Sequence, residues 1–248
     1  MNEAVRLSVV VPFYNEAACL EAVCHEVREI LQREVPGAWE LIMVDDGSRD
    51  GTAALIDDLA RQYPGLRALH LQPNSGQSAA LEAGFAAARG DLIATLDGDG
   101  QNDPGDLRRL MEELERRQVD MMCGVRVNRA DNWVRRISSR LANRVRAALL
   151  HDHISDVGCS IRVFRRQCLT RLHFFRNAHR FFPALVQMQG FRVAEMPVRH
   201  RPRLRGESKY GGGIRSRLWV GLADLAGVYW LRKRALRYGV IEESRPHG

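Results

Sequence analysis

Short apolar runs alternate with amphipathic stretches through the first half of the chain. Runs of five or six mostly apolar residues between turn-forming residues predict strands, here Leu7–Pro12, Trp39–Val44, Leu66–Leu71, Leu92–Leu96 and Met121–Val125. The stretches between them have apolar residues at helical spacing, and these are Ala17–Gln32, Thr52–Gln62, Ser78–Arg89 and Leu107–Gln118. Asp103-Pro104 predicts the start of the last of these helices. The alternation predicts an α/β domain with a mostly parallel central sheet flanked by helices.

The second half is less regular. Its pattern predicts a basic helix over Asn132–Leu150 and two strands over Ile161–Phe164 and Phe191–Val198, with a short helix between them over His179–Gln189. An Arg- and Gly-rich loop is predicted over Arg199–Gly213, followed by a final helix over 214–238. Neither an internal repeat nor a second hydrophobic core is evident. We therefore predict one domain over residues 1–213, a C-terminal amphipathic helix over 214–238 and a flexible tail over 239–248.

Polar clusters follow four consecutive predicted strands. They are Tyr14-Asn15-Glu16, Asp45-Asp46-Gly47-Ser48, Asn74-Ser75-Gly76 and Asp97-Gly98-Asp99-Gly100-Gln101. Ligands of parallel sheets bind at the carboxyl ends of the strands, where these clusters meet. Core packing alone does not explain this arrangement, so we expect a ligand site along this edge of the sheet.

The pair Asp97 and Asp99 ends an almost entirely apolar strand. Two carboxylates so close repel each other unless a cation joins them. Hard oxygen ligands suit Mg²⁺ or Mn²⁺, which retain positions for phosphate oxygens. A solvated acidic turn with Asp103 as the next helix cap explains the pair equally well.

The composition is that of an ordinary soluble protein, with 45% hydrophobic and 27% charged residues. The five cysteines show no CxxC spacing, which favours reduced buried thiols in a cytosolic protein over a disulfide framework or a zinc site. No basic segment followed by an apolar stretch precedes Leu7, so we do not expect a secretory signal.

The net charge of +7 is unevenly distributed. From Arg199 to the end, twelve Lys and Arg stand against four Asp and Glu, so the entire basic excess lies in the final fifth of the chain. Such a surplus favours an anionic partner, such as phosphate, nucleic acid or a membrane surface. A generally high use of arginine, at 35 of 37 cations, explains the total but not the location.

The final predicted helix is apolar and flanked by basic residues. Between Arg217 and Arg232 it offers 14 residues including Asp224, about 21 Å of helix, against a hydrocarbon core of roughly 30 Å. We therefore expect a helix on the membrane surface, or one that docks on a small membrane protein, rather than a transmembrane span. Packing of this helix on the core of the domain is the alternative.

The motifs taken together resemble family 2 glycosyltransferases. The resemblance rests on four segments in the family's order and spacing: Val10-Val11-Pro12-Phe13-Tyr14-Asn15-Glu16, Val44-Asp45-Asp46-Gly47-Ser48-x-Asp50-Gly51-Thr52, Asn74-x-Gly76 and Leu96-Asp97-x-Asp99-x-Gln101-x-x-Pro104. Gln101 and the element Arg203-Leu204-Arg205-Gly206-Glu207-Ser208-Lys209-Tyr210 are similar to the dolichol-phosphate mannose synthase branch and its bacterial polyprenyl-phosphate relatives. The resemblance spans residues 7–213 and implies a Rossmann-like nucleotide-diphospho-sugar transferase domain.

The resemblance implies a role for each matching residue. The donor site would comprise Pro12, Tyr14, Glu16, Asp45, Asp46, Gly76, Asp97 and Ser208, with Pro12, Tyr14 and Glu16 as the base and ribose wall and Asp45 as the partner of the base. The metal ligands would be Asp97, Asp99 and Gln101. Catalytic roles fall to Asp99, Arg126, Arg205 and Lys209, the last two on a loop that closes over the donor.

The acceptor or phosphate contacts implied are Arg136, Asp156 and Arg162. A solvated helix face explains Arg136 as well as a ligand role does. Asp156 could orient the sugar or acceptor, or cap a turn. The segment Asp156-Val157-Gly158-Cys159-Ser160-Ile161-Arg162 departs from the eukaryotic synthases towards bacterial enzymes, so the sugar is left open. The Arg- and Gly-rich loop could also be an ordinary basic surface loop.

The function implied is metal-dependent, inverting transfer of a sugar from a UDP- or GDP-sugar to a polyprenyl phosphate, at the cytoplasmic face of the inner membrane. The leaving diphosphate gains negative charge, which a metal and Arg or Lys donors would stabilise. A glycan or another non-lipid acceptor is the alternative. A basic nucleic-acid-binding module is the more distant one, and it leaves the acidic clusters unexplained, so we expect no nucleic-acid partner.

Overall fold

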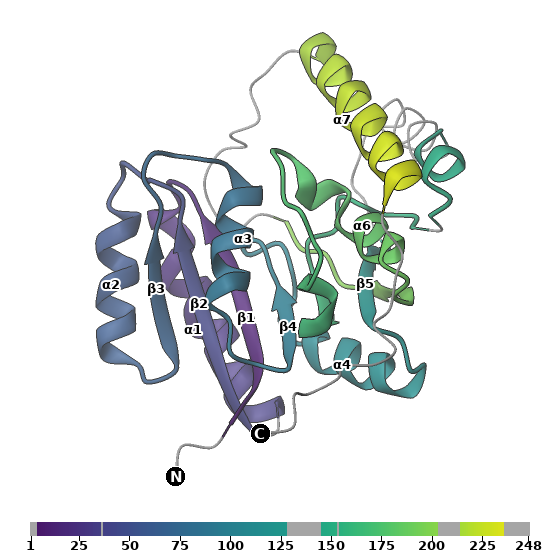
Figure 1. Ribbon diagram of the computed structural model, residues 1–248. Helices are drawn as coiled ribbons and strands as arrows, with labels where there is room; N and C mark the ends of the chain where they lie inside the picture. The colour runs from purple at the N-terminus through teal and green to yellow at the C-terminus, as the bar shows by residue number, and fades with distance from the viewer. Residues whose placement is uncertain (1–3, 36, 128–144, 153, 203–213, 236–248) are drawn as a thin grey trace, which may run out of the picture.

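The computed structural model describes residues 4–35, 37–127, 145–152, 154–202 and 214–235. Within them, seven strands form one sheet in the order β3-β2-β1-β4-β6-β5-β7 (Figure 1). Their bounds are β1 Val5–Phe13, β2 Ala38–Asp45, β3 Leu66–His70, β4 Leu92–Thr95, β5 Met121–Arg126, β6 Arg162–Arg165 and β7 Val193–Val198. The predicted strands are therefore all present, with ends that shift by one or two residues.

The sheet is mostly parallel, as predicted. Strands β3, β2, β1 and β4 pair in parallel, and β5 pairs in parallel with β7. The exception is β6, which lies between β4 and β5 and is antiparallel to both. The carboxyl ends of β1, β2, β3 and β4 thus share one edge of the sheet, so the four polar clusters lie along the same edge.

Helices cover both faces of the sheet. Their bounds are α1 Ala17–Glu34, α2 Thr52–Gln62, α3 Gln77–Ala87, α4 Asp106–Arg116, α6 Phe182–Met188 and α7 Ile214–Arg234. Apolar residues of α1, α2 and α4 join one core cluster with the sheet, while those of α3 and α6 join a second cluster. The architecture is therefore a three-layer α/β sandwich (Figure 1).

The two core clusters follow from the alternation of side chains along the strands. On β1, Val9 and Val11 face the first cluster and Val10 faces the second. On β2, Met43 faces the first cluster and Ile42 the second. A strand that is apolar on both faces must be covered on both, which explains the nearly continuous hydrophobic runs in the sequence.

Some of the predicted helices differ from the structure by more than shifts of one or two residues. Helix α4 begins at Asp106 rather than at Asp103-Pro104, because Asp103 caps a turn: its carboxylate accepts the Gly105 N–H at 3.0 Å. The helix predicted over His179–Gln189 is divided into a 3₁₀ turn, Ala178–Arg180, and α6. The predicted helix over Asn132–Leu150 lies mostly outside the described residues, but residues 145–150 are helical.

Helix α7 packs on the domain by one side. Leu225 and Val228 join a third apolar cluster with residues of α6, and Asn177 donates a hydrogen bond to Asp224 at 3.0 Å. The opposite side leaves Trp219 and Trp230 exposed, at 72% and 59%. None of the helices within the described residues is long and apolar enough to cross a bilayer.

Candidate functional site

A cleft of about 310 Å³ opens at the carboxyl ends of the parallel strands. Its lining comes from the segments that follow β1, β2, β3 and β4, and comprises Pro12, Phe13, Tyr14, Glu16, Asp46, Asn74, Gly76, Gln77, Asp97, Gly98 and Asp99. The cleft has apolar walls from the end of β1 and carboxylates from the ends of β2 and β4. It therefore combines an apolar surface for a ring with oxygen ligands for a cation.

The wall formed by Tyr14 and Glu16 is fixed by the loop after β2. The Asn15 N–H donates to the Ser48 hydroxyl at 2.8 Å, and the Glu16 N–H donates to the Thr52 hydroxyl at 3.0 Å. In return, the Asn15 side chain accepts the Arg49 N–H at 2.7 Å. The two loops therefore form one hydrogen-bonded unit beside the cleft.

Asp46 organises the floor of the cleft from a buried position. Its carboxylate accepts the N–H groups of Ser75 and Gly76 and the side-chain amide of Asn74, each at 2.8 Å. Its neighbour Asp45 is also buried, does not line the cleft, and accepts the Ser48 N–H at 3.1 Å. Of the two acids, Asp46 shapes the cleft directly.

Hydrogen bonds from several segments hold Asp97 and Asp99. The Asp97 N–H donates to the Asn102 side chain at 2.8 Å, and Gln77 at the start of α3 donates to the Asp97 carboxylate at 2.9 Å. Asp99 accepts the Gln101 N–H at 3.0 Å. The two carboxylates are thus oriented before any ligand binds.

Gly98 allows the backbone between the two acids to lie on the core. A Cβ at this position would be 2.5 Å from Cδ1 of the buried Phe13 and 2.8 Å from the Pro12 carbonyl oxygen. Only glycine fits without moving β1, so the spacing of the acidic pair is set by packing as well as by ligand chemistry.

The electrostatics of the acidic pair is unfavourable for two charges. Burial and the negative charge of Asp99 raise the pKa of Asp97 to about 6, against the opposing influence of Ser160, Arg162 and Arg126. Among the described residues, no group of three or more His, Cys, Asp or Glu could hold a metal by itself. A cation here would therefore need further ligands, such as the oxygens of a bound diphosphate.

Arg126 and Asp156 form a bidentate ion pair near the acidic pair. The Arg126 Nε and Nη2 atoms donate to the two Asp156 oxygens at 2.8 and 2.7 Å. Arg162, on β6, is buried and donates to the carbonyl oxygens of Val157 and His179, both at 3.0 Å. Both arginines lower the pKa of Asp97, so their charges act on the cleft.

Gln101 connects the acidic pair to the segment after β7. Its side-chain amide nitrogen lies 3.3 Å from the Arg201 carbonyl oxygen and 3.5 Å from His200 Nε2. Arg201 in turn pairs with Glu26 of α1 at 2.6 Å and with Asp103 at 2.9 Å. The segment that leads to residues 203–213 is therefore anchored beside Asp99.

The sequence matches the family model described as "Glycosyl transferase family 2" over residues 8–172. This range contains every residue that lines the cleft. The chain belongs to glycosyl transferase family 2. The resemblance inferred from the motifs is confirmed, and so is the prediction of a glycosyltransferase.

Curated relatives of this glycosyltransferase act on polyprenyl phosphates, as their names state. It is 39% identical over 245 residues to the dodecaprenyl-phosphate galacturonate synthase of Rhizobium johnstonii, covering 96% of this chain and 70% of that protein. It is 38% identical over 212 residues to the undecaprenyl-phosphate 4-deoxy-4-formamido-L-arabinose transferase of Aeromonas hydrophila, covering 85% of this chain and 64% of that one. The chain thus spans about two thirds of the length of such relatives.

Solved structures confirm the fold. The mannosyltransferase PcManGT from Pyrobaculum calidifontis, in complex with GDP-Man and Mn²⁺, aligns with a TM-score of 0.65 at 20% identity over 96% of this chain and 67% of its own. Glucosyl-3-phosphoglycerate synthase from Mycobacterium tuberculosis, in complex with Mn²⁺, UDP and glucosyl-3-phosphoglycerate, aligns with a TM-score of 0.63 at 19% identity over 95% of this chain and 82% of its own. The predicted nucleotide-diphospho-sugar transferase fold is therefore confirmed.

The structure brings most of the predicted site residues of this glycosyltransferase together. The cleft contains seven of them: Pro12, Tyr14, Glu16, Asp46, Gly76, Asp97 and Asp99. Gln101 contacts Asp99, Arg126 and Arg162 act electrostatically on Asp97, and Asp156 pairs with Arg126. Asp45 is buried and does not line the cleft. Arg136, Arg205, Ser208 and Lys209 lie outside the described residues, and their roles stay predictions.

Residues to which the sequence reasoning assigned no role also build the site. Gln77 holds Asp97, Asn74 is held by Asp46, and Asn102 accepts the Asp97 N–H. Gln77 and Asn102 lie next to recognised motif residues, so position along the chain was an available signal for them. Glu195, discussed below, is more than 90 residues from the acidic pair and had no such signal.

Proposed function

We propose that this glycosyltransferase transfers a sugar from a UDP- or GDP-sugar to a polyprenyl phosphate, using Mg²⁺ or Mn²⁺. The observation that carries the proposal is that Asp97 and Asp99 line the same cleft as Pro12, Tyr14 and Glu16. Such a cleft fits a nucleoside at one end and a diphosphate at the other. The names of the curated relatives support the lipid acceptor.

The acidic pair fits a divalent cation. Two carboxylates share the cleft, and the pKa of Asp97 is raised to about 6 by burial and by the charge of Asp99. A bound cation would therefore relieve the repulsion between these two carboxylates. The donor atoms are oxygens, which Mg²⁺ and Mn²⁺ prefer. Asp97, Asp99 and Gln101 are the residues proposed to hold the ion. When bound, it would supply positive charge to the diphosphate.

The chain's own residues position the donor and stabilise its leaving group. Asp46 orders the loop 74–76 against which the nucleotide would lie. Asp45, whose carboxylate accepts the Ser48 N–H, is the proposed partner of the base. Arg126 places a fixed positive charge near the diphosphate, where negative charge grows as the sugar leaves. Arg205, Ser208 and Lys209 are proposed to add further contacts to the donor.

The proposed acceptor needs no strong base. A lipid phosphate is already an anion at neutral pH, so positioning of the two substrates carries the reaction, with inversion at the sugar carbon. Arg136, Asp156 and Arg162 are the residues proposed for the acceptor side. Of these, Asp156 pairs with Arg126, and Arg162 donates a hydrogen bond to the His179 carbonyl oxygen. These contacts support a role in shaping the site.

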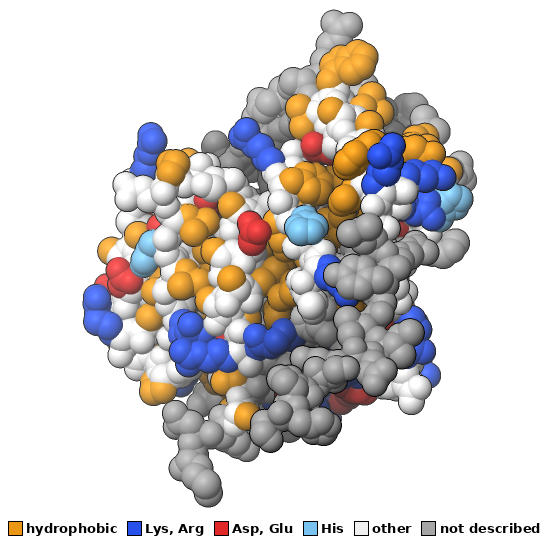
Figure 2. Space-filling model, viewed as in Figure 1, with side chains coloured by type: hydrophobic (Ala, Val, Ile, Leu, Met, Phe, Trp, Pro, Cys, Tyr) orange, Lys and Arg blue, Asp and Glu red, His pale blue; other side chains and the backbone are white. Residues whose placement is uncertain are grey.

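The exposed side of α7 supports attachment to the membrane surface. It carries Trp219, Val220, Leu222, Tyr229 and Trp230, with exposed fractions from 37% to 72%, and ends in Arg232, Lys233 and Arg234 (Figure 2). Aromatic residues beside basic ones favour an interface with anionic lipid. We propose that residues 1–213 act as the catalytic domain and that α7 holds it at the cytoplasmic face of the inner membrane.

A transfer assay tests the proposed reaction. Purified protein is supplied with UDP- and GDP-sugars, Mn²⁺ or Mg²⁺, and undecaprenyl phosphate, and the lipid product is separated. We expect product with at least one donor, and none with the Asp99→Asn variant or after EDTA. Product formed equally well on a glycan, and without the lipid, would favour the alternative acceptor.

Vesicle flotation tests the membrane proposal. Vesicles with anionic lipid should carry the protein, and Trp219→Ser with Trp230→Ser should release it. If the protein does not bind anionic vesicles, α7 has another role, such as binding a small membrane protein.

A further inference from the structure

An acidic side chain on β7 reaches towards the turn that follows residue 154. Glu195 lies beside Cys123 of β5 in the parallel register, and its side chain is partly buried. Its carboxylate oxygens accept the Ser155 N–H at 2.9 and 3.0 Å and the Asp156 N–H at 3.3 Å. A carboxylate that accepts consecutive backbone N–H groups fixes the turn that carries them.

That turn presents Asp156 to Arg126. The pair is bidentate, and the two side chains are only 5% and 16% exposed. The Arg126 N–H also donates to Asp156 at 3.2 Å. The guanidinium plane is therefore set by Asp156, because two parallel hydrogen bonds leave it no freedom to rotate. A Cβ at Gly158 would lie 2.8 Å from Arg126 Nη2, so the turn closes tightly around the pair.

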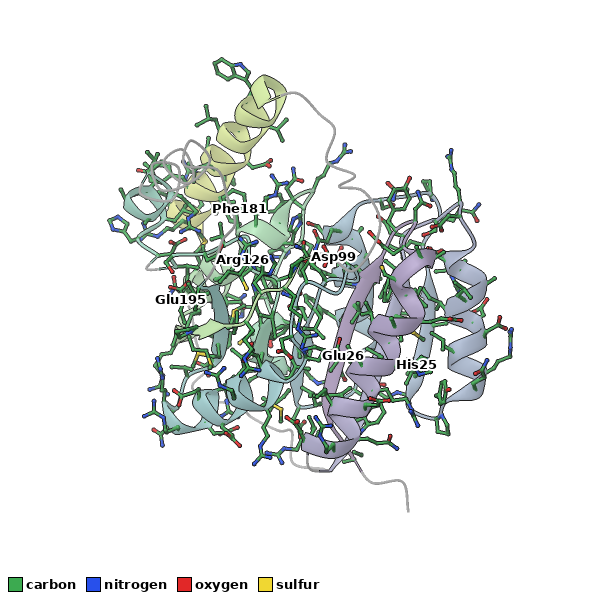
Figure 3. The ribbon with its side chains drawn as sticks, turned by 180° about the vertical axis from the view of Figure 1, so that it is seen from behind. His25, Glu26, Asp99, Arg126, Phe181 and Glu195 are labelled. Atoms are coloured by element: carbon green, nitrogen blue, oxygen red, sulfur yellow. The ribbon has the colours of Figure 1, made fainter. Side chains whose placement is uncertain are left out.

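Arg126 in turn faces the acidic pair. The segment that follows Asp156 lies beside this pair, because the Ser160 hydroxyl donates to the Asn102 side chain at 2.8 Å and the same side chain accepts the Asp97 N–H. Figure 3 shows Arg126 between Asp99 on one side and Glu195 on the other. Asp156 occupies Nε and Nη2, so the Nη1 edge of the guanidinium is turned away from it.

We propose that Glu195 is a positioning residue for the transfer reaction: it fixes the 155–156 turn, which makes Asp156 hold Arg126 in the orientation that meets the donor diphosphate. The inference rests on the proposed donor role of Arg126. Glu195 does not line the cleft, and its carboxylate accepts hydrogen bonds from the 155–156 turn, so we expect its effect to pass through the ion pair.

The turn has a second support that keeps it folded. Arg146 is buried, donates to the Ile154 carbonyl oxygen and pairs with Asp152 at 3.2 Å. Arg162 also donates to the Val157 carbonyl oxygen and Asp156 itself pairs with Arg126, so loss of the Glu195 carboxylate leaves other attachments of the turn in place. We expect the segment to stay in place while Asp156 loses its fixed direction.

A double-mutant cycle tests the proposal. The wild type is first tested with UDP and with GDP in the presence of Mn²⁺, and the nucleotide that binds more tightly is chosen. Its dissociation constant, and kcat/KM for the matching sugar donor, are then measured for Glu195→Ala, Arg126→Ala and the double variant. We expect Glu195→Ala to lower kcat/KM about tenfold in the wild type and less than twofold when Arg126 is absent. Glu195→Gln should recover most of the activity, because Oε1 alone accepts both N–H groups.

The control is Glu115→Ala, which removes a glutamate that pairs with Arg165 at the surface and should leave both measurements unchanged. An equal loss from Glu195→Ala in both backgrounds would overturn the proposal, because it would show a general structural role. If Glu195→Ala does not fold, the cycle is run with Glu195→Asp. A wild type that binds neither nucleotide refutes the proposed function itself, and this result differs from an additive cycle.

Discussion

The glycine between the two acids offers a precise test of how packing sets the site. Gly98→Ala adds a single methyl group whose carbon would lie 2.5 and 2.7 Å from two ring atoms of Phe13. Unstrained carbon contacts lie at about 3.5–4.0 Å, so ring and backbone must separate by about 1 Å. Phe13 is 1% exposed and packed in the core, so it has no free space to move into.

The expected cost follows from this overlap. Overpacking of a well-packed core costs about 1–3 kcal/mol of unfolding free energy. Asp97 and Asp99 flank the altered residue, so they shift with it. A displacement of about 1 Å in a catalytic group can lower the rate by about a hundredfold, and we expect a loss of activity between tenfold and that value.

Urea denaturation and the transfer assay measure the two effects, with Gly105→Ala as the matched control. A Cβ at Gly105 has only Asp103 Oδ1 within 3.2 Å, and its φ of −62° suits alanine. We expect this control to change stability by about 0.5 kcal/mol or less. A Gly98→Ala protein with the stability and activity of the wild type would refute the reasoning about the acidic pair.

Three further predictions follow from other parts of the structure. Asp46→Asn places an amide donor against the Ser75 or Gly76 N–H, so one hydrogen bond to a charged group is lost. Such a bond contributes about 1.5 kcal/mol, and we therefore expect calorimetry to show nucleotide binding weakened about tenfold. Burial opposes ionisation of Glu40, but hydrogen bonds from Ser8, Arg67 and the Arg89 N–H, with the charge of Arg67, lower its pKa. The stabilisation that this carboxylate provides is present above the unfolded pKa of about 4.3 and is lost as the pH falls through the folded value. Urea titrations should therefore show that the difference in stability between wild type and Glu40→Gln disappears at acid pH. Burial raises the pKa of Cys24, Cys123 and Cys168 to about 12, so these thiols should react with a disulfide reagent at pH 8 only after unfolding; fast reaction in the native protein would contradict their burial.

The first half of the fold was predictable because its signals are local. Each parallel strand is an apolar run that ends in polar residues, and the topology of βαβ units then brings those ends together. The lining of the cleft by Tyr14, Asp46 and Asp97 follows from this rule and from the motifs. Packing adds the reason for Gly98, which the motif alone does not give.

The second half depends on contacts between distant residues. The insertion of the antiparallel β6 between β4 and β5 is decided by how strands pair across the sheet, and no periodicity records it. The Arg126–Asp156 pair joins positions 30 residues apart, and Glu195 adds a third segment 39 residues further on. Asp103 looked like a helix cap from its neighbour Pro104, but its carboxylate caps a turn that precedes α4 and also pairs with Arg201.

Binding of Mn²⁺ tests the central claim most directly. Calorimetry, or the electron paramagnetic resonance of free Mn²⁺, measures its affinity in the presence of UDP or GDP for wild type, Asp99→Asn and the surface control Asp58→Asn. We predict nucleotide-dependent binding that Asp99→Asn weakens at least about tenfold while Asp58→Asn does not. Equal affinity of wild type and Asp99→Asn would contradict a cation held by the acidic pair.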